Sequence, residues 1–380
     1  MRRSHASQLS IKRHMEQTVF HAWHQAHHGR MVDFAGWSMP VQYSSIVEEH
    51  NAVRQRVGLF DISHMGRLEF QGPDAVRLLD HLLTNEVSTL KPGQVRYSLV
   101  CREDGGILDD VLVYRVEQSI DGQPTHLLVV NASNRIKILE WIEANRAGFN
   151  ATVVDRTKEW AMIALQGPQA CQLMAGYATP DPAPFKYYTC WKGQTPRGPV
   201  IASRTGYTGE DGIELMIPVD AAAAVWDDLM ARGAGDGIQA CGLGCRDTLR
   251  LEAAMPLYGH ELNEQIDPLT AGLQFAVKLT KDFIGRARLS EIAASPLDRV
   301  RVGLAIEGKR IAREHTPVKV GADVVGEVTS GTFSPTLQRT IGMAFLARAH
   351  AAIGTPVQVD LRGTLIPATV APLPFYKRQK

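Results

Sequence analysis

The sequence predicts an α+β fold that ends in a small β-barrel or sandwich, and three observations lead to this prediction. Short apolar strands alternate with amphipathic helices between residues 59 and 148. A similar order of strands and helices recurs from 152 to 255. After about residue 280 the helical spacing disappears, and short alternating strands separated by Gly and Pro follow, which is typical of small all-β domains.

The first group of elements can be followed in order. The stretch "GRLEFQG" alternates as a half-buried strand does, and "PDAVRLLDHLL" repeats apolar residues at helical spacing. Three strand-like runs follow: "VRYSLVC", "ILDDVLVYRV" and "THLLVVNA". The run "NASNRIKILEWIEANRAG" then predicts a helix ended by Gly148. Strands joined by short Gly- and Asp-containing turns favour antiparallel pairing.

The second group echoes the first. The segment "ALQGPQACQLM" resembles "EFQGPDAVRLL", and each copy reads as a strand, a Gly–Pro turn and a helix. This similarity indicates an internal duplication. The segment "EIAASPLD" is predicted to be a linker, and the strands of the C-terminal domain follow it.

Composition limits the classes of function. The chain has 380 residues, of which 44% are hydrophobic and 21% charged, and its formal net charge is +1. This is the balance of an ordinary globular enzyme of two or three domains. There is no basic surplus to attract nucleic acid or a membrane surface, and no run of eighteen apolar residues, so neither partner is expected.

The first fifteen residues, "MRRSHASQLSIKRHM", contain four Arg or Lys and no acid. They are expected to be a disordered extension outside the fold. A short organellar transit segment has the same composition. The expected location is therefore the bacterial cytoplasm, or the mitochondrial matrix if this segment is a transit peptide.

Neither the cysteines nor the histidines predict a metal site. The five cysteines do not form a disulfide framework, and Cys241 and Cys245 are interpreted as two small core thiols. His24 and His28 are one helical turn apart, but no acidic third ligand lies near them. We therefore expect no metal cofactor.

The stretch "GGILDDVLVY" places two carboxylates inside an apolar strand. Because side chains alternate between faces, Asp110 should share a face with Leu108 and Leu112, while Asp109 shares the other face with Val111. The two acids should then point in opposite directions without forming a like-charge pair. Burial would raise the pKa of such a carboxyl toward the range useful for proton transfer. The alternative is that one Asp belongs to the preceding turn and the other lies on a solvated edge.

Two further segments carry candidate binding residues. In "SRTGYTGEDGIELMIP" a Gly-rich loop leads into a strand in which Glu214 stands among apolar residues; an exposed Glu on a hairpin is the alternative. In "CGLGCRDTLRLEAAMPLYGHEL" a helix is predicted from about Arg246, with Asp247 near its N-terminus and Pro256 ending it. Arg246 can hold an anionic group there, or form surface ion pairs with Asp247 and Arg250.

Several known motifs of catalysis are missing. The sequence contains no G-x-x-x-x-G-K-[ST] phosphate loop and no G-x-S-x-G elbow. Phosphoryl transfer and serine hydrolysis therefore have no support.

Taken together, the motifs resemble one family. The segments "MVDFAGWSMPVQY", "LFDISHMGR", "GGILDDVLVY", "LQGPQA", "RTGYTGEDGIEL", "GLGCRDTLRLEAAMPLYGHEL" and "VTSGTFSPTLQRTIGMAFL" stand in the order found in aminomethyltransferases, the T-proteins of the glycine cleavage system. The resemblance runs from about residue 18 to Tyr376. It implies a three-lobed fold, with two interwoven α+β lobes and a C-terminal β-barrel around a site for tetrahydrofolate.

The resemblance also implies domains, partners and an activity. The expected domains are the extension at 1–15, a folate-binding unit at 16–280 and a barrel at 297–376. The expected partner is the lipoylated H-protein, and the expected co-substrate is tetrahydrofolate. The family moves the one-carbon unit of the aminomethyl group carried by the H-protein to tetrahydrofolate and releases ammonia.

The resemblance assigns roles to particular residues. Asp110 matches the essential aspartate of the family, which leaves Asp109 structural or solvated. Glu214 matches the glutamate that holds the pterin ring. The other implied folate contacts are Arg246, Tyr376, Met65, Tyr97 and Asn131. The usual motif is varied by Cys245 and Ala254, which are small residues in place of small residues.

Two alternatives of the same architecture remain open on the sequence. One is a folate-dependent demethylase or the related domain of dimethylglycine and sarcosine oxidases. The other is a non-enzymatic folate-binding protein of iron–sulfur maintenance, which carries a K-G-C-Y-x-G-Q-E motif. The corresponding segment here is "TKDFIGR", with Phe283 in place of the cysteine, which argues against the second alternative.

Overall fold

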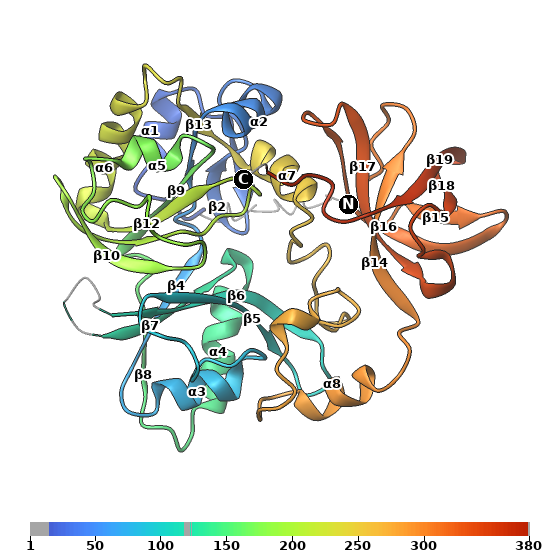
Figure 1. The fold of residues 1–380 in the computed structure, drawn as a ribbon, viewed down its shortest axis with the longest axis horizontal. Helices are drawn as coiled ribbons and strands as arrows, with labels where there is room; N and C mark the ends of the chain where they lie inside the picture. Colours follow the sequence, from blue (N-terminus) through green and yellow to red (C-terminus); the bar gives the residue numbers. More distant parts are fainter. Residues whose placement is uncertain (1–14, 118–121, 123, 379–380) are drawn as a thin grey trace, which may run out of the picture.

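The computed structural model describes residues 15–117, 122 and 124–378. The chain forms two α+β lobes and a C-terminal closed barrel, as Figure 1 shows. The predicted fold class is confirmed. Of the expected N-terminal extension, residues 1–14 lie outside the described residues. In the part of the chain that the structure describes, no helix is both long and apolar enough to cross a membrane.

The first lobe is a five-stranded antiparallel sheet in the order β5-β6-β7-β4-β8, with helices α3 and α4 packed on one face. Its elements are β4 (Gly66–Gln71), α3 (Ala75–Leu82), β5 (Gln94–Cys101), β6 (Ile107–Val116), β7 (Thr125–Val130), α4 (Arg135–Asn145) and β8 (Thr152–Asp155). The predicted antiparallel pairing is confirmed. β6 has a partner on each side, but its acidic stretch pairs with β5 alone, because the pairing with β7 begins at Leu112.

The second lobe is a six-stranded sheet in the order β10-β11-β12-β9-β3-β13. Its strands are β3 (Gly58–Asp61), β9 (Trp160–Gln166), β10 (Cys190–Thr195), β11 (Gly198–Ser203), β12 (Gly212–Pro218) and β13 (Gln239–Cys241). The lobe also carries α1 (His21–Ala26), α2 (Ile46–Gln55), α5 (Ala170–Met174), α6 (Val219–Arg232) and the hairpin of β1 (Met31–Phe34) and β2 (Trp37–Pro40). Since β3 precedes the first lobe in the chain and the other strands follow it, the two lobes are interwoven.

The two strand–turn–helix units that the sequence predicts are both present. The unit β4–α3 lies in the first lobe and the unit β9–α5 in the second, and each is a strand, a tight turn and a helix. The turns place Gly72 at φ +105° and Gly167 at φ +133°. A side chain at Gly167 would collide with the carbonyl oxygen of Arg56, so the close approach of the turn to α2 requires glycine.

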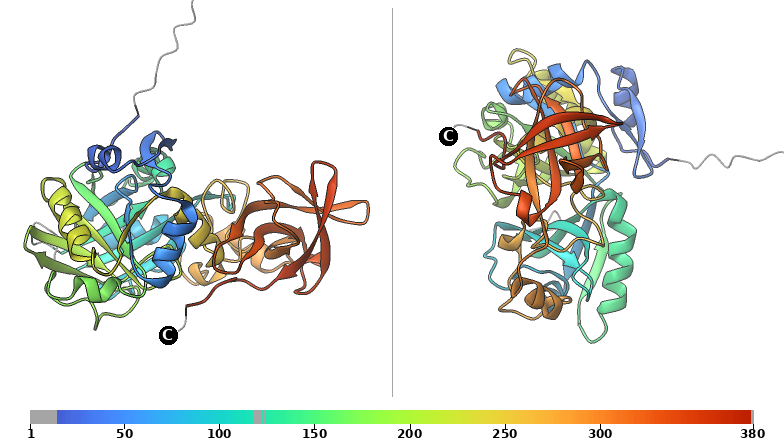
Figure 2. Two further views of the ribbon diagram at one scale, coloured as in Figure 1. Left: turned by 90° about the horizontal axis from the view of Figure 1, so that it is seen from above. Right: turned by 90° about the vertical axis from the view of Figure 1, so that its right-hand side faces the viewer.

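The C-terminal strands close into a barrel in the order β14-β17-β16-β15-β18-β19. They are β14 (Arg299–Ile306), β15 (Pro317–Val320), β16 (Asp323–Ser334), β17 (Arg339–Ala347), β18 (Pro356–Leu361) and β19 (Thr364–Ala371). Of the two predicted forms, barrel and sandwich, the barrel is correct. The barrel lies to one side of the lobes in Figure 2. The linker prediction was partly wrong, because Glu291–Ala293 continue helix α8 (Arg286–Ala293).

Helix α7 (Leu243–Glu252) packs against α2 and the barrel strand β16, as Figure 1 shows. The prediction that it begins near Arg246 was wrong, because it begins at Leu243, with Gly242 as N-cap. The Gly242 N–H donates to the buried carboxylate of Glu49 at 2.8 Å, so a side chain from α2 satisfies this helix end. Asp247 therefore lies half-way along the helix.

His24 and His28 do not act together. His24 is buried and contacts the Asp61 carboxylate at 3.0 Å and the Tyr43 hydroxyl at 2.8 Å. His28 lies beyond the end of α1 and is exposed.

A buried ion pair connects α7 to the segment that precedes the barrel. Arg250 Nη1 donates to Glu261 at 2.8 Å, and both side chains are almost completely inaccessible. Glu261 also accepts hydrogen bonds from Thr329 and Ser330 of β16, at 2.5 and 2.6 Å. Because every partner is buried, removal of one leaves an uncompensated polar group.

We expect Glu261→Ala to lower the free energy of unfolding by about 3–5 kcal/mol, because the buried Arg250 would lose its buried carboxylate and keep only the exposed Asp247 as an ionic partner. Urea denaturation followed by circular dichroism measures this loss. The matched control is Glu291→Ala, which removes an exposed ion pair with Arg288 and should change stability by less than about 0.5 kcal/mol. Equal losses in the two variants would contradict this account of the junction.

Candidate functional site

A cavity of about 790 Å³ lies where the two lobes, α7 and the first barrel strand meet. Six of the seven side chains predicted from the sequence line it: Met65, Tyr97, Asp110, Asn131, Glu214 and Arg246. They come from both sheets and from α7, so segments far apart in the chain converge on one site.

Asp110 lies on β6 and faces this cavity. Its Oδ2 accepts a hydrogen bond from the Tyr97 hydroxyl at 3.1 Å, and its Oδ1 accepts one from the Asn131 amide at 2.8 Å. Burial raises the pKa of Asp110 above the ordinary carboxyl value, and these two hydrogen bonds lower it part of the way back. The side chain is therefore held in one orientation and is poised to accept or hold a proton.

Asp109 is completely buried on the other face of β6. It accepts hydrogen bonds from the Asn131 backbone N–H at 2.9 Å, the Asn131 amide at 2.8 Å and the Asn134 amide at 2.6 Å. Burial raises its pKa, and the nearby charge of Asp110 raises it further. The expectation of a solvated or turn position is wrong for both acids.

The two carboxylates are nevertheless linked. One amide group, that of Asn131, donates to Asp109 and Asp110 at 2.8 Å each. The prediction of opposite faces is correct for these two residues, but the prediction that they do not interact was wrong. A bulge explains a further difference, because Leu108 is inserted between Ile107 and Asp109 and packs with Val111 instead of on the Asp110 face.

Glu214 lies in the middle of β12, between β11 and β9. It is 6% exposed and accepts a hydrogen bond from the Thr205 hydroxyl at 2.5 Å. Burial raises its pKa, while the Thr205 bond and the charge of Arg246 lower it. The alternative of an exposed hairpin Glu is therefore wrong, and the carboxylate retains further acceptor capacity on the cavity side.

Arg246 is presented by the first turns of α7. Its guanidinium stacks over the Tyr207 ring at 4.8 Å, and its buried Nη1 has no hydrogen-bond partner among the described residues. Burial lowers its pKa, and the Glu214 charge opposes this change. Asp247 and Arg250 form an ion pair at 2.7 Å, but the Arg250 side chain is buried, and the pair does not include Arg246. Its unpaired donor makes Arg246 suited to holding a ligand.

Tyr376 is the one predicted residue that does not line the cavity. Its ring lies 4.0 Å from the Arg54 guanidinium, and its N–H donates to the Glu252 carbonyl at 2.8 Å. The C-terminal segment thus crosses α7 and α2 outside the cavity. A folate contact through Tyr376 stays a prediction.

Sequence reasoning missed other side chains that line the cavity. They include His64, Tyr207, Phe275 and Arg301. His64 precedes the candidate Met65 in "SHMG", and Tyr207 lies in "TGYTG" of the Gly-rich loop before Glu214. These positions were the signal in the sequence that could have identified the two residues. Phe275 and Arg301 carry no comparable local signal, because only the tertiary fold brings them to the cavity.

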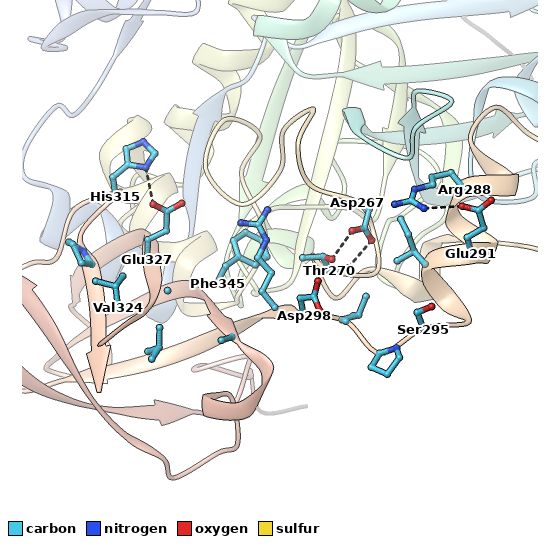
Figure 3. A pocket seen from close by; sticks show the side chains of 18 residues that line it. Asp267, Thr270, Arg288, Glu291, Ser295, Asp298, His315, Val324, Glu327 and Phe345 are labelled. Atoms are coloured by element: carbon cyan, nitrogen blue, oxygen red, sulfur yellow. Dashed lines mark hydrogen bonds and ion pairs between the residues drawn. The ribbon is translucent and has the colours of Figure 1, made fainter. Parts of the chain in front are cut away.

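A second hollow, of about 890 Å³, lies between α8, its linker and the barrel. Figure 3 shows two pairs of charged groups in it, Arg288 with Glu291 at 2.9 Å and His315 with Glu327 at 3.5 Å. None of the predicted site residues lies there. Size alone therefore does not identify the site.

Among the residues that the structure describes, one group of side chains has metal-ligand chemistry: Glu49, Cys241 and Cys245, whose ligand atoms lie within 4.8 Å of one another. The two cysteines are buried free thiols, as predicted. The Glu49 carboxylate already accepts hydrogen bonds from the backbone N–H groups of Tyr43, Ser44 and Gly242. This cluster is accounted for as the support of the N-terminus of α7.

Two family models match consecutive parts of the chain. The GCVT N-terminal domain matches residues 20–281, and the glycine cleavage T-protein C-terminal barrel domain matches residues 299–377. Together they define a class of proteins in which a GCVT N-terminal domain precedes a C-terminal barrel domain.

Individual relatives match over almost the whole chain. An aminomethyltransferase of Streptomyces coelicolor is 48% identical, covering 96% of this chain and 99% of its own length, and one of Bacillus cereus (strain B4264) is 46% identical, covering 93% and 95%. The crystal structure of the glycine cleavage system aminomethyltransferase T from Bartonella henselae superposes with a TM-score of 0.87 at 32% identity, covering 96% and 98%. The chain belongs to the glycine cleavage T-protein family of aminomethyltransferases.

The buried acids predict a pH dependence of stability. Folding raises the pKa of Asp109 above its unfolded value, so the folded state binds the extra proton, and stability is lost as pH rises above about 4. In Asp109→Asn this loss should be smaller between about pH 5 and pH 8. Urea unfolding at a series of pH values measures it. Parallel curves for the two proteins would show that Asp109 does not titrate in this way.

Proposed function

We propose that this protein transfers the one-carbon unit of aminomethyl-dihydrolipoyl H-protein to tetrahydrofolate and releases ammonia. The observation that carries the proposal is the convergence of Asp110, Glu214 and Arg246 on one cavity. The names of its relatives favour aminomethyl transfer over demethylation or a non-catalytic folate-binding role.

The chemistry of the cavity suits a reduced folate. A carboxylate accepts two neighbouring N–H donors, and the amino group and ring N–H of a pterin offer such a pair to Glu214. The unpaired Nη1 of Arg246 supplies a donor for a ring heteroatom or carbonyl oxygen. A volume of about 790 Å³ is within the range of cavities that hold small molecules.

In the proposed reaction the protein itself forms no bond to the transferred carbon, and its role is to position the reactants. Two bonds form between the transferred carbon and the folate nitrogens, while its bonds to the amino nitrogen and to sulfur break. The two protons that leave the folate nitrogens pass to the departing ammonia and thiol. Since the folate amines are themselves the nucleophiles, Asp110 orients the reacting nitrogen and relays a proton.

The expected partner is the lipoyl arm of the H-protein, which has to reach the Asp110 side of the cavity. Phe275 lies at this side, 68% exposed and stacked on Tyr97 at 5.8 Å between ring centroids. The rings of Phe275 and Tyr97 are thus suited to receive an apolar arm next to the folate.

The first test is Asp110→Asn. We expect kcat for ammonia release from loaded H-protein to fall about 100- to 10,000-fold, because an amide can neither accept nor relay the proton, while the Kd of tetrahydrofolate changes little. The matched control is Asp104→Asn, in the exposed turn that precedes the same strand, which should keep wild-type activity. Activity of Asp110→Asn close to wild type with folate still bound would refute the assignment.

The second test addresses the folate-binding role of Glu214. Glu214→Gln keeps the shape but loses the charge and one acceptor, so the Kd of tetrahydrofolate should rise about ten- to hundred-fold. Anaerobic isothermal titration calorimetry measures this change. An unchanged Kd would show that the pterin ring does not contact Glu214.

A further inference from the structure

His64 is a buried polar side chain that lines the cavity beside the candidate residues. It lies in the turn between β3 and β4, next to Met65, and is 2% exposed. Its Nδ1 is buried and has no hydrogen-bond partner among the described residues. Because a buried polar atom loses its bonds to water, an unpaired one in a native structure calls for an explanation, and a functional role of the side chain is one.

The backbone on both sides of His64 is held rigidly. Arg67 is completely buried, and its Nη1 donates to the carbonyl oxygen of Ser63, at 2.9 Å, and to that of Met65. The Ser63 N–H donates to Asp61 Oδ1 at 2.8 Å. The ring is thus placed by a pinned turn, as pre-organised ligand-binding groups are.

The surroundings of the ring keep it neutral. Burial lowers the pKa of His64 to about 4; the Asp61 charge opposes this change, and the charges of Arg246 and Arg67 add to it. A neutral imidazole offers one donor and one acceptor. The ring makes a T-shaped contact with the ring of Phe34, another cavity residue, with 5.4 Å between centroids.

Location distinguishes His64 from a second histidine of similar character. His126 of β7 also has a buried, unpaired ring nitrogen and a pKa lowered to about 4 by burial. However, His126 does not line the cavity. An unpaired nitrogen alone therefore does not indicate a site; for His64 the further observations are that the residue lines the cavity and stands on a pinned turn.

We propose that His64 is a further binding residue of this cavity and that its imidazole forms a hydrogen bond to the ring system of a bound reduced pterin, on the Arg246 side. This inference rests on the proposed function, since it names a contact to the same ligand. His64 binds and orients the ligand through this hydrogen bond.

The test compares His64→Leu with His126→Leu in the full-length protein. We expect His64→Leu to raise the Kd of tetrahydrofolate about ten-fold in anaerobic calorimetry, and His126→Leu to leave it unchanged. The melting temperature of the ligand-free His64→Leu protein should stay the same or rise, because the variant removes an unpaired buried group. A purely structural histidine would give the reverse, a lower melting temperature and an unchanged Kd.

Two conservative variants keep the test decisive if His64→Leu does not fold. His64→Asn places an amide near the position of Nδ1, and His64→Gln places one near Nε2, so one of them should restore binding to within about three-fold of wild type. Unchanged binding in all three variants overturns the proposal, and so does a change confined to the KM for loaded H-protein.

The outcomes also separate this inference from the proposed function. If wild type binds tetrahydrofolate and Glu214→Gln weakens it while the His64 variants do not, only the role of His64 fails. If wild type does not bind tetrahydrofolate, the proposed function itself fails.

Discussion

The structure of the site depends on one constraint, which is the burial of two adjacent carboxylates in the interior strand β6. Charged groups in an apolar sheet are strongly unfavourable unless donors surround them. Asn131 provides most of these donors, since its amide and backbone N–H reach Asp109 and the same amide reaches Asp110. Asp109 thereby anchors the end of β7 to β6, and Asp110 is left free to face the cavity.

The remaining elements bring further polar groups to the cavity that Asp110 faces. The interwoven lobes place β12, with Glu214, opposite β6, although the two strands lie in different sheets. Helix α7 adds Arg246, and its position depends on Glu49 at one end and on the buried pair Arg250–Glu261 near the other. Buried polar contacts therefore help to fix the position of α7 at the cavity, and the geometry of the cavity is sensitive to each of them.

Local patterns in the sequence were sufficient for the fold class and marked Asp110, Glu214 and Arg246 as candidates, whereas the other candidate site residues came only from the resemblance to the family. Alternation placed Asp110 and Glu214 correctly on strands, and turn residues marked the repeated strand–turn–helix units. What could not be predicted depends on contacts between distant residues. The bulge at Leu108 and the shared amide of Asn131 need the strand partners of β6, and the start of α7 at Leu243 needs Glu49 from α2. For the same reason His64 was missed, since its burial and its pinned turn come from Arg67 and the neighbouring sheet.

The most direct measurement is a crystal structure of the protein soaked with a stable reduced folate. The account predicts that the pterin ring lies in the cavity between the lobes, with its amino edge on Glu214 and with Asp110 within hydrogen-bonding distance of the reactive nitrogen. A reduced folate bound elsewhere, for example in the hollow between α8 and the barrel, with Asp110 and Glu214 untouched, would contradict it.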